Sequence, residues 1–272
     1  MHNTNIGIIG AGNMGRALAA GLAATPGAPR AWLYDQNDDT RALAAGQGLT
    51  VTATLAELVA QADVLVLAIK PQHVPALARG LAPGLAARNP LILSVAAGIR
   101  TGALRHWLQS PRVVRAMPNT PALIQAGATA LYAPADITQE DRTRIEMLLR
   151  PVSALWWVDD EDLMDAATAV SGSGPAYFFL AIEALTAAGV HAGLPETMAG
   201  ELATATALGA ARMAASGNAP PATLRRQVTS PNGTTERAIH SFMDQGFMKI
   251  FEVAVEAARA RAAELGQELG KL

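Results

Sequence analysis

The chain contains no cysteine and few charged residues. The absence of cysteine from its 272 residues excludes a disulfide framework, a thiolate metal site and a cysteine nucleophile, and it fits a reducing compartment. Charged residues make up 16% of the chain and hydrophobic residues 50%, which excludes a disordered protein, because disorder has the reverse composition. A formal net charge of -2 gives no electrostatic reason to expect nucleic acid or an anionic membrane surface as a partner.

The chain also lacks a recognisable targeting or membrane-spanning segment. Residues 1–5 lead into an apolar strand without a basic region, so no signal peptide is expected. Two uncharged stretches, 117–135 and 166–182, approach the length of about 20 residues that a spanning helix needs. Prolines break the first, and the sequence Ser-Gly-Ser-Gly-Pro at 171–175 breaks the second. These features predict a soluble, cytoplasmic protein without a membrane partner.

The first part of the chain alternates short aliphatic runs with helical stretches. Continuous apolar runs such as 64–68 are typical of strands buried on both faces, which means a parallel sheet covered by helices. The runs 128–133 and 154–158, on either side of a polar helix at 138–150, are candidates to extend this sheet. Strands are predicted at 5–10, 31–35, 49–51, 63–69, 91–96 and 112–116, with helices near 13–24, 38–46, 54–61, 71–81 and 101–108.

After residue 162 the pattern predicts helices alone, so we place a domain boundary near 160. Between residues 166 and 217 the only charged residues are Glu183, Glu196, Glu201 and Arg212. A surface helix normally has a polar face, and these helices barely have one, which predicts burial by a partner subunit. The helices are expected near 161–170, 175–189, 195–215, 220–229, 234–244 and 247–268.

A glycine-rich segment follows the first predicted strand. Gly10, Gly12 and Gly15 form the pattern G-x-G-x-x-G between that strand and a helix. The first glycine permits a tight turn, the second lets a pyrophosphate approach the backbone, and the third lets helix and strand pack closely. Residues 1–160 are therefore predicted to form a dinucleotide-binding domain.

An acidic residue, Asp35, lies at the end of the second predicted strand. A carboxylate there can accept hydrogen bonds from the adenosine ribose and would repel a 2′-phosphate, which favours NAD over NADP. The alternative is a cap for the helix that opens at residues 38–39. The next arginine is Arg41, so an obvious clamp for a 2′-phosphate is missing.

Three further strand ends carry candidate ligand-contacting residues. Lys70 lies in Ala-Ile-Lys-Pro-Gln at 68–72, small residues follow the strand at 91–96, and Asn119 lies between two prolines. Ligands bind at the carboxyl edge of such sheets. The alternatives are a solvated charge at Lys70, a tightly packed turn, and an asparagine that merely caps its turn.

Two segments of the helical part are unlike ordinary helices. In 171–175, Ser173 is a candidate N-cap and Pro175 suits a first helical turn, and the alternative is a helix–helix corner. In Val-Thr-Ser-Pro-Asn-Gly-Thr-Thr-Glu at 228–236, a polar turn opens a helix. Its free N–H groups and the hydroxyls of Thr234 and Thr235 suit a small carboxylate, unless the segment is only an ordinary helix start.

The common hydrolase and metal patterns are missing. His2, His73, His106, His191 and His240 are scattered without ligand spacing, and neither H-E-x-x-H nor G-x-S-x-G occurs. No metal site is predicted. An oxidoreductase built this way needs a substrate that requires little acid–base help, and a protonated imine is such a substrate.

Taken together, these segments resemble pyrroline-5-carboxylate reductases over essentially the whole chain. The segments 10–15, 68–72, 94–98, 117–121, 169–177 and 228–235 follow in the order and spacing of that family. The resemblance implies an α/β Rossmann domain with a mostly parallel sheet at 1–160, followed by an all-helical substrate-binding and dimerisation domain at 161–272. It also implies NADPH or NADH as cofactor, 1-pyrroline-5-carboxylate and L-proline as substrate and product, and a homodimer. In many members such dimers assemble further, often to decamers.

The resemblance also implies roles for single residues. The glycine-rich loop would hold the pyrophosphate, the 68–71 segment would line the cofactor cleft, and two residues would lie near the nicotinamide. The start of the 234–244 helix would bind the substrate carboxylate, with the Thr235 hydroxyl near the ring nitrogen as the catalytic group. The cofactor residues are Gly10, Gly12, Asn13, Met14, Gly15, Asp35, Ala68, Lys70, Pro71, Ala97 and Asn119, and the substrate residues are Ser230, Gly233, Thr234 and Thr235.

Two residues depart from the family pattern. Thr54 replaces an asparagine that members often place against the adenosine ribose, and Asp35-Gln36 stands where many members have small polar or basic residues. Two other hypotheses compete. A beta-hydroxyacid dehydrogenase would need a catalytic lysine in the helical part, where only Lys249 and Lys271 occur. A non-catalytic NAD(P)-sensing module would bind the cofactor without turnover.

Overall fold

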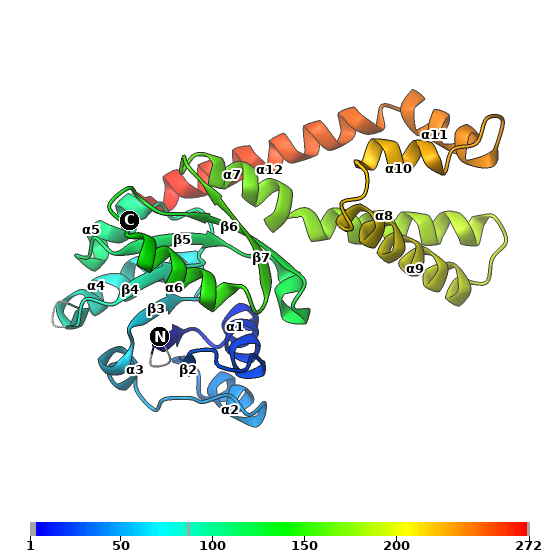
Figure 1. Ribbon diagram of the computed structural model, residues 1–272. Helices are drawn as coiled ribbons and strands as arrows, with labels where there is room; N and C mark the ends of the chain where they lie inside the picture. The colour runs from blue at the N-terminus through cyan, green and yellow to red at the C-terminus, as the bar shows by residue number, and fades with distance from the viewer. Residues whose placement is uncertain (1–3, 86–87, 271–272) are drawn as a thin grey trace. The chain divides into compact units, whose positions relative to one another are not determined.

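The computed structural model describes residues 4–85 and 88–270 (Figure 1). His2 and Lys271 lie outside these ranges, as do the first three residues of the N-terminal segment in which no signal peptide is expected.

One mixed sheet organises the first part of the chain. Its strand order is β2-β1-β3-β4-β5-β6-β7. The first five strands in this order are parallel, β6 runs antiparallel to β5, and β7 runs parallel to β6. The predicted mostly parallel sheet is confirmed, and both candidate runs extend it. The strands are β1 (Asn5–Ile9), β2 (Arg30–Tyr34), β3 (Val64–Leu67), β4 (Leu91–Ser94), β5 (Val113–Met117), β6 (Gly127–Tyr132) and β7 (Ser153–Val158).

The strand predicted at 49–51 is wrong. Only Val51 pairs, through a single bridge to Leu33 at the outer side of β2. The N–H of Leu33 bonds to the Thr50 carbonyl at 2.9 Å, and the N–H of Thr52 bonds to the Leu33 carbonyl at 2.9 Å. A single bridged residue does not form a strand. The chain therefore has one strand fewer before Lys70 than expected, and the segment that carries Lys70 follows the third strand.

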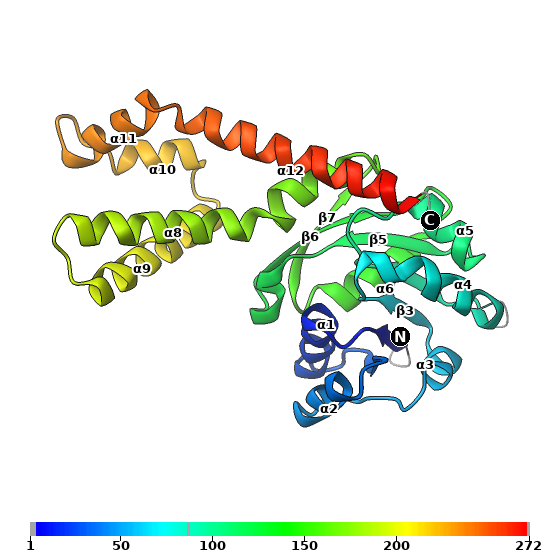
Figure 2. The ribbon, with the colours of Figure 1, turned by 180° about the vertical axis from the view of Figure 1, so that it is seen from behind.

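Helices cover both faces of the sheet (Figures 1 and 2). Side chains such as Leu18 and Ile145 pack α1 and α6 on one face, and side chains such as Leu58 and Leu104 pack α3 and α5 with α4 on the other. The strands lie between these two cores, as their continuous apolar sequences predict. The helices are α1 (Asn13–Ala24), α2 (Asp38–Gly46), α3 (Leu55–Gln61), α4 (Val74–Leu85), α5 (Thr101–Leu108) and α6 (Gln139–Leu149), with short 3-10 turns at Pro71–His73 and Thr120–Ile124.

The second part of the chain is helical, as predicted. Its helices are α7 (Leu163–Ala167), α8 (Gly174–His191), α9 (Glu196–Ala215), α10 (Pro221–Gln227), α11 (Thr234–Asp244) and α12 (Phe247–Gly270). The compact units do not divide at 160. Residues up to Ser173 belong with the sheet, as do those from Glu256 onward, and Gly174–Val255 form the second unit. The reason lies in α7, whose Met164 is fully buried, and in Leu269 of α12, which joins the core beside α5.

The segment 171–175 does not break its helix. Residues Thr168–Gly172 form one π turn between α7 and α8, and the N–H of Ser173 reaches the Thr168 carbonyl at 2.9 Å. A π turn inserts one residue without ending the helix, which the sequence pattern of small residues does not reveal. The resulting helical run, Leu163–His191, has a mean hydropathy of 1.2 and is long and apolar enough to cross a membrane, judged by length and composition alone.

A buried ion-pair network joins α7 to the sheet. Arg115 on β5 is fully buried and lies 3.4 Å from Glu161 and 3.6 Å from Asp165. The Glu161 carboxylate also accepts the N–H of Thr101 at 2.7 Å and its hydroxyl at 2.8 Å, at the first turn of α5. Beside this network Asp162 pairs with Arg100 and raises the pKa of that guanidinium above its ordinary value.

We expect Arg115→Met to destabilise the protein by about 3–5 kcal/mol, because it leaves two carboxylates buried without their cation. The matched control is Arg100→Met, which breaks an exposed pair and should cost about 1 kcal/mol or less. Urea denaturation of both variants measures the difference. Equal losses of stability would mean that the buried network contributes no more than a surface ion pair.

Candidate functional site

The glycine-rich loop has the geometry that a bound pyrophosphate requires. Gly10 has φ +104°, and a Cβ there would lie 2.3 Å from the Ala68 carbonyl oxygen. A Cβ on Gly15 would lie 1.9 Å from the Gly10 carbonyl oxygen, so α1 approaches the loop as closely as only glycine permits. A Cβ on Gly12 would meet nothing within 4 Å, because this glycine faces open space. Two glycines thus close the loop, and the third keeps its outer side clear.

The start of α1 presents backbone donors beside Gly12. The helix has no side-chain cap and no acid in its first turn. Within the described ranges, the N–H groups of Asn13 and Met14 have no hydrogen-bond partner. Such an uncapped N-terminus carries the positive end of the helix dipole and suits a phosphate. The predicted pyrophosphate residues therefore fit a dinucleotide.

Asp35 is attached to this loop rather than to α2. Its Oδ2 accepts the Ala11 N–H at 2.9 Å, and its Oδ1 accepts the Asn37 N–H at 3.0 Å. The cap of α2 is Asn37, whose Oδ1 accepts the Thr40 N–H at 3.1 Å, so the capping interpretation of Asp35 is wrong. The half-buried carboxylate lies at the end of β2 with one oxygen on the glycine-rich loop.

The other cofactor candidates follow parallel strands and share their carboxyl edge. Ala68 follows β3, and its N–H bonds to the Ile9 carbonyl at 2.8 Å. Lys70 is exposed at the start of the short turn that begins with Pro71. Ala97 is half-buried in the loop after β4. In the next position of that loop, Gly98 has φ +78° and lies against Gly266 of α12.

Asn119 uses its amide to hold the protein backbone. Its Oδ1 accepts the Ala128 N–H at 2.9 Å, and its Nδ2 donates to the Ser171 carbonyl at 3.0 Å. The side chain is buried and connects the turn after β5 with β6 and the π turn. Asn119 is a structural clamp in this arrangement. Its predicted place beside the nicotinamide stays a prediction.

Two arginines at this edge were not predicted as site residues. Arg16 donates to the Ala11 carbonyl at 2.7 Å and to Asn13 Oδ1 at 3.1 Å. Arg41 donates to the Asp35 carbonyl, pairs with Asp38 and lies over the Tyr34 ring at 5.6 Å from its centroid. The sequence spacing of six residues between Asp35 and Arg41 gave no sign of this contact, because it depends on how α2 leaves the turn. The same contact places a cation where the sequence suggested none.

The substrate candidates lie in the second compact unit, at the start of α11. Gly233 is the N-cap residue and contributes no side-chain acceptor. The N–H groups of Thr234, Thr235 and Glu236 have no partner in the part of the chain that the structure describes. The half-buried Thr235 hydroxyl likewise makes no hydrogen bond there, whereas the Ser230 carbonyl accepts the Gly233 N–H at 3.0 Å. This start can therefore hold a small anion.

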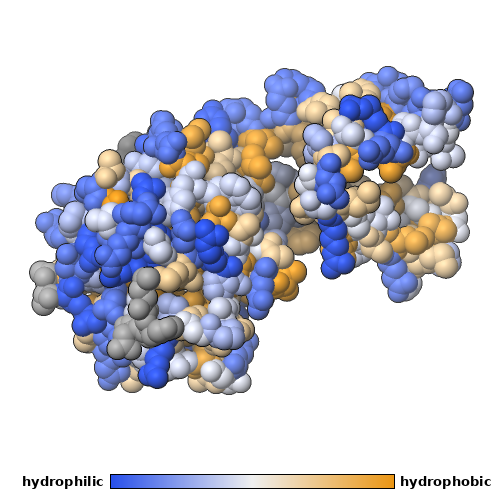
Figure 3. Space-filling model, in the orientation of Figure 1, coloured by the Kyte–Doolittle hydropathy of each residue, from blue (hydrophilic) through white to orange (hydrophobic). Residues whose placement is uncertain are grey.

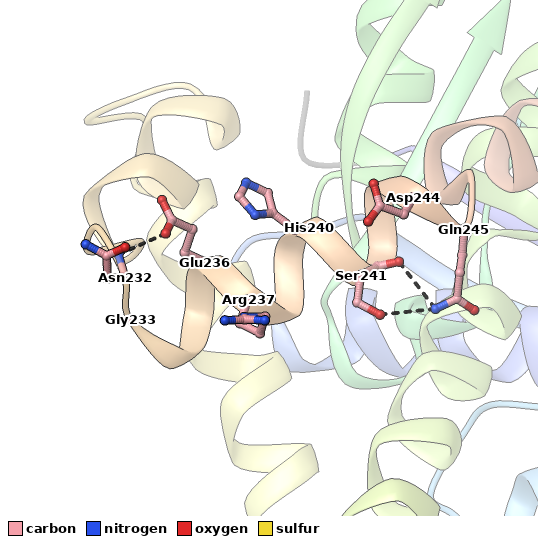
Figure 4. Close-up of a pocket in the computed structure, with 8 residues that line it drawn as sticks. All are labelled: Asn232, Gly233, Glu236, Arg237, His240, Ser241, Asp244 and Gln245. Carbon is pink, nitrogen blue, oxygen red and sulfur yellow. Dashed lines mark hydrogen bonds between the residues drawn. The ribbon is translucent and has the colours of Figure 1, made fainter.

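Figure 4 shows the turn and the polar face of α11. The Asn232 N–H donates to Glu236 Oε2 at 2.8 Å, which fixes the acidic side chain at the turn. A hollow of about 510 Å³ runs along this face, and Thr235 does not line it. The hollow is lined by Asn232, Gly233, Glu236, Arg237, His240, Ser241, Asp244 and Gln245.

Gly15 and Gly12 make a matched pair of tests. We expect Gly15→Ala to cost about 3 kcal/mol of stability, because its Cβ collides with backbone that cannot move aside. Gly12→Ala should melt like the unaltered protein but bind NADH roughly tenfold more weakly, since its methyl group occupies the open side of the loop. Melting curves and fluorescence titration measure both. Unchanged NADH binding by Gly12→Ala would remove the loop from the nucleotide site.

Comparisons with known proteins agree with this geometry. A family model described as pyrroline-5-carboxylate reductase dimerisation matches residues 161–265, and one described as coenzyme F420-dependent NADP oxidoreductase matches residues 5–98. The chain is 49% identical to the pyrroline-5-carboxylate reductase of Pseudomonas aeruginosa over 275 residues, covering 100% of both, and 39% identical to that of Pisum sativum, covering 96% of this chain and 95% of the relative.

Solved structures point the same way. The structure of a pyrroline-5-carboxylate reductase from Coxiella burnetii superposes on this chain with a TM-score of 0.91 at 37% identity, covering 96% of this chain and 98% of the other. That of the Plasmodium falciparum pyrroline carboxylate reductase with NADP bound gives 0.82 at 28% identity, with 98% and 99% covered. The predicted fold class and resemblance are confirmed: the chain belongs to the pyrroline-5-carboxylate reductase family.

Proposed function

We propose that the chain reduces 1-pyrroline-5-carboxylate to L-proline with NADPH or NADH, the last step of proline biosynthesis. One observation carries the proposal beyond family membership. The most specific predicted segment, 228–235, folds into a helix start whose backbone donors and Thr235 hydroxyl are all left without protein partners in the described chain. A free amide cluster with a free hydroxyl is what a small carboxylate beside a ring nitrogen requires.

Different groups at the start of α11 bind the carboxylate and the ring nitrogen of the substrate. The free amides of Thr234 and Thr235 bind the carboxylate, and they belong to the backbone, so side-chain substitutions leave them in place. The Gly233 N–H, expected to act with them, donates instead to the Ser230 carbonyl at 3.0 Å and holds the turn. When bound, NAD(P)H supplies the hydride that the imine carbon accepts. The Thr235 hydroxyl hydrogen-bonds the ring nitrogen as it changes from iminium to amine. The iminium brings its own proton, so the site works without a strong general acid.

The cofactor is bound by residues of the first compact unit. The uncapped start of α1 and the open side of Gly12 support the pyrophosphate, and Ala68, Lys70, Pro71 and Ala97 lie along the same sheet edge. Asp35 at the end of β2 can accept hydrogen bonds from the ribose hydroxyls, which favours NADH. The decisive assay mixes the protein with NAD(P)H and 1-pyrroline-5-carboxylate and follows absorbance at the nicotinamide band. Nucleotide binding without turnover would instead favour the NAD(P)-sensing module.

The competing dehydrogenase hypothesis finds little support in the helical unit. Lys249 lies on α12, where its Nζ pairs with Glu252 at 2.7 Å and both side chains are exposed. A catalytic lysine is normally placed by burial or by a precise polar partner, not by a surface ion pair with its own helix.

Thr235 provides the sharpest test of the catalytic assignment. We expect Thr235→Ala to lower kcat/KM about 10- to 100-fold, the effect of losing a hydrogen bond worth roughly 1.5–3 kcal/mol to a charged group. Thr235→Ser keeps the hydroxyl and should retain much more activity. If Thr235 only starts the helix, Thr235→Ala will melt earlier while its turnover per folded enzyme is unchanged. Steady-state kinetics and a melting curve on the same preparations separate these results.

The helical unit also supports self-association into a homodimer. Apolar side chains along α8, α9 and α12 are exposed in the single chain, among them Phe178, Leu180 and Met248. Hydrophobic surface is visible over α8 and α9 (Figure 3). Monomers rarely expose apolar area on this scale, because burying it contributes about 25 cal/mol per Å². A second copy would also cover the apolar run Leu163–His191. Assembly of dimers into decamers and a cytoplasmic location stay predictions.

Leu180→Glu should therefore convert the dimer into monomers, because a carboxylate placed in an apolar interface loses its hydration without gaining a partner. Leu43→Glu is the control, since Leu43 is a similarly exposed leucine (52% against 64%) on α2 of the first unit. Sedimentation velocity at micromolar concentration compares the three proteins. A wild-type protein that sediments as an active monomer would contradict the dimer.

A further inference from the structure

Charged side chains are concentrated in the turn after β2. Asp35, Asp38, Asp39 and Arg41 lie within seven residues of one another, next to the glycine-rich loop. Two backbone N–H groups hold the Asp35 carboxylate at 2.9 and 3.0 Å, one from the loop and one from the turn. Because both of its oxygens are engaged, this carboxylate is a fixed part of the turn. The charges of Asp38, Asp39 and Arg41 therefore determine the electrostatic surroundings of the adenosine end of a dinucleotide.

Arg41 is placed at this turn by three contacts. One guanidinium nitrogen donates to the Asp35 carbonyl, the other pairs with the Asp38 carboxylate, and the group lies over the Tyr34 ring. The arginine side chain is 23% exposed, whereas that of Asp38 is 87% exposed. The carbonyl and the ring belong to the strand end and fix the position of the cation. Asp38, by contrast, is a solvated partner that another anion can replace.

We propose that Arg41 binds the 2′-phosphate of NADPH and that Asp38 competes with this phosphate for the guanidinium. In dinucleotide-binding folds an acid at the end of the second strand faces the ribose hydroxyls, and a nearby arginine accommodates a 2′-phosphate. This chain has both groups in one turn. NADH leaves the Asp38–Arg41 pair intact, and NADPH has to displace Asp38. The pair thus sets the preference between the two cofactors, and the proposal rests on the proposed function only for nucleotide binding at the loop.

The neighbouring acid supplies a matched control. Asp39 carries the same charge, lies in the same first turn of α2, and has no ion-pair partner among the described residues. Removing either acid changes the net charge of the turn equally. Removing Asp38 alone frees the guanidinium. A general electrostatic effect therefore predicts equal results for the two substitutions, and direct competition predicts unequal ones.

The test measures binding of adenosine fragments, which needs no turnover. Calorimetry compares 2′,5′-ADP with 5′-ADP on the full-length protein and on Asp38→Asn, Asp39→Asn and Arg41→Ala. Asp38→Asn should tighten 2′,5′-ADP about tenfold, the scale of one charge-assisted hydrogen bond, and leave 5′-ADP unchanged. Asp39→Asn should tighten it much less. Arg41→Ala should weaken 2′,5′-ADP about tenfold while 5′-ADP again reports an intact site.

Each alternative result overturns the proposal in a different way. Equal tightening by both acid substitutions would show that net charge, not competition for Arg41, governs the preference. Unchanged 2′,5′-ADP binding by Arg41→Ala would remove Arg41 from the phosphate site. If Arg41→Ala fails to fold, Arg41→Lys, which keeps the charge but not the planar guanidinium, takes its place in the comparison. If no variant binds either nucleotide, the nucleotide site itself is wrong. Normal fragment binding without proline formation would overturn the proposed reaction alone.

Discussion

The contact of Arg115 with Glu161 and Asp165 is the constraint on which the candidate site depends. A guanidinium that is fully buried in the sheet needs anionic partners to offset its lost hydration. Both partners, Glu161 and Asp165, lie on the segment that begins the helical part. Glu161 simultaneously takes the first N–H of α5. One cation thereby fixes β5, α5 and α7 together. The π turn continues the chain directly from α7, and the Asn119 amide, which follows β5, holds this turn through the Ser171 carbonyl.

Much of the fold could be predicted because its signals are local. The apolar runs, the glycine pattern at 10–15 and the helix start at 233–235 each depend on residues close in sequence, and each is found where it was expected. The failures involve partners distant in sequence. Residues 49–51 resemble a strand but have one partner residue, and 171–175 resemble a break but continue as a π turn above Met117. Neither the pairing of 49–51 nor the continuation of the helix through 171–175 can be deduced from the residues of the segment itself.

The same distinction holds within the candidate site. The sequence identifies Asp35 and Asn119 correctly as polar residues at strand ends. What each side chain bonds to depends on three-dimensional neighbours: the loop N–H of Ala11 for Asp35, and the carbonyl of Ser171, 52 residues away, for Asn119. The sequence shows no obvious clamp for a 2′-phosphate, because the path of α2, which brings Arg41 back to the Asp35 carbonyl, is not part of the sequence pattern. Long polar side chains are the hardest to place, since their reach exceeds the precision of any local signal.

Helix starts distinguish structural ends from candidate anion sites. Asn37, Thr54 and Thr138 cap α2, α3 and α6 with their own side chains, and the distant Glu161 serves α5. In each of these helices a side chain accepts one of the first N–H groups. α1 and α11 begin instead at Gly12 and Gly233, which have no side chain to offer. Both glycines follow turns that other backbone bonds hold in place, so the donors stay oriented without a cap. α9 and α10 also lack a side-chain cap, but they begin at Pro195 and Pro220. The glycine starts of α1 and α11, held by their turns, are therefore the two that can bind a pyrophosphate and a carboxylate.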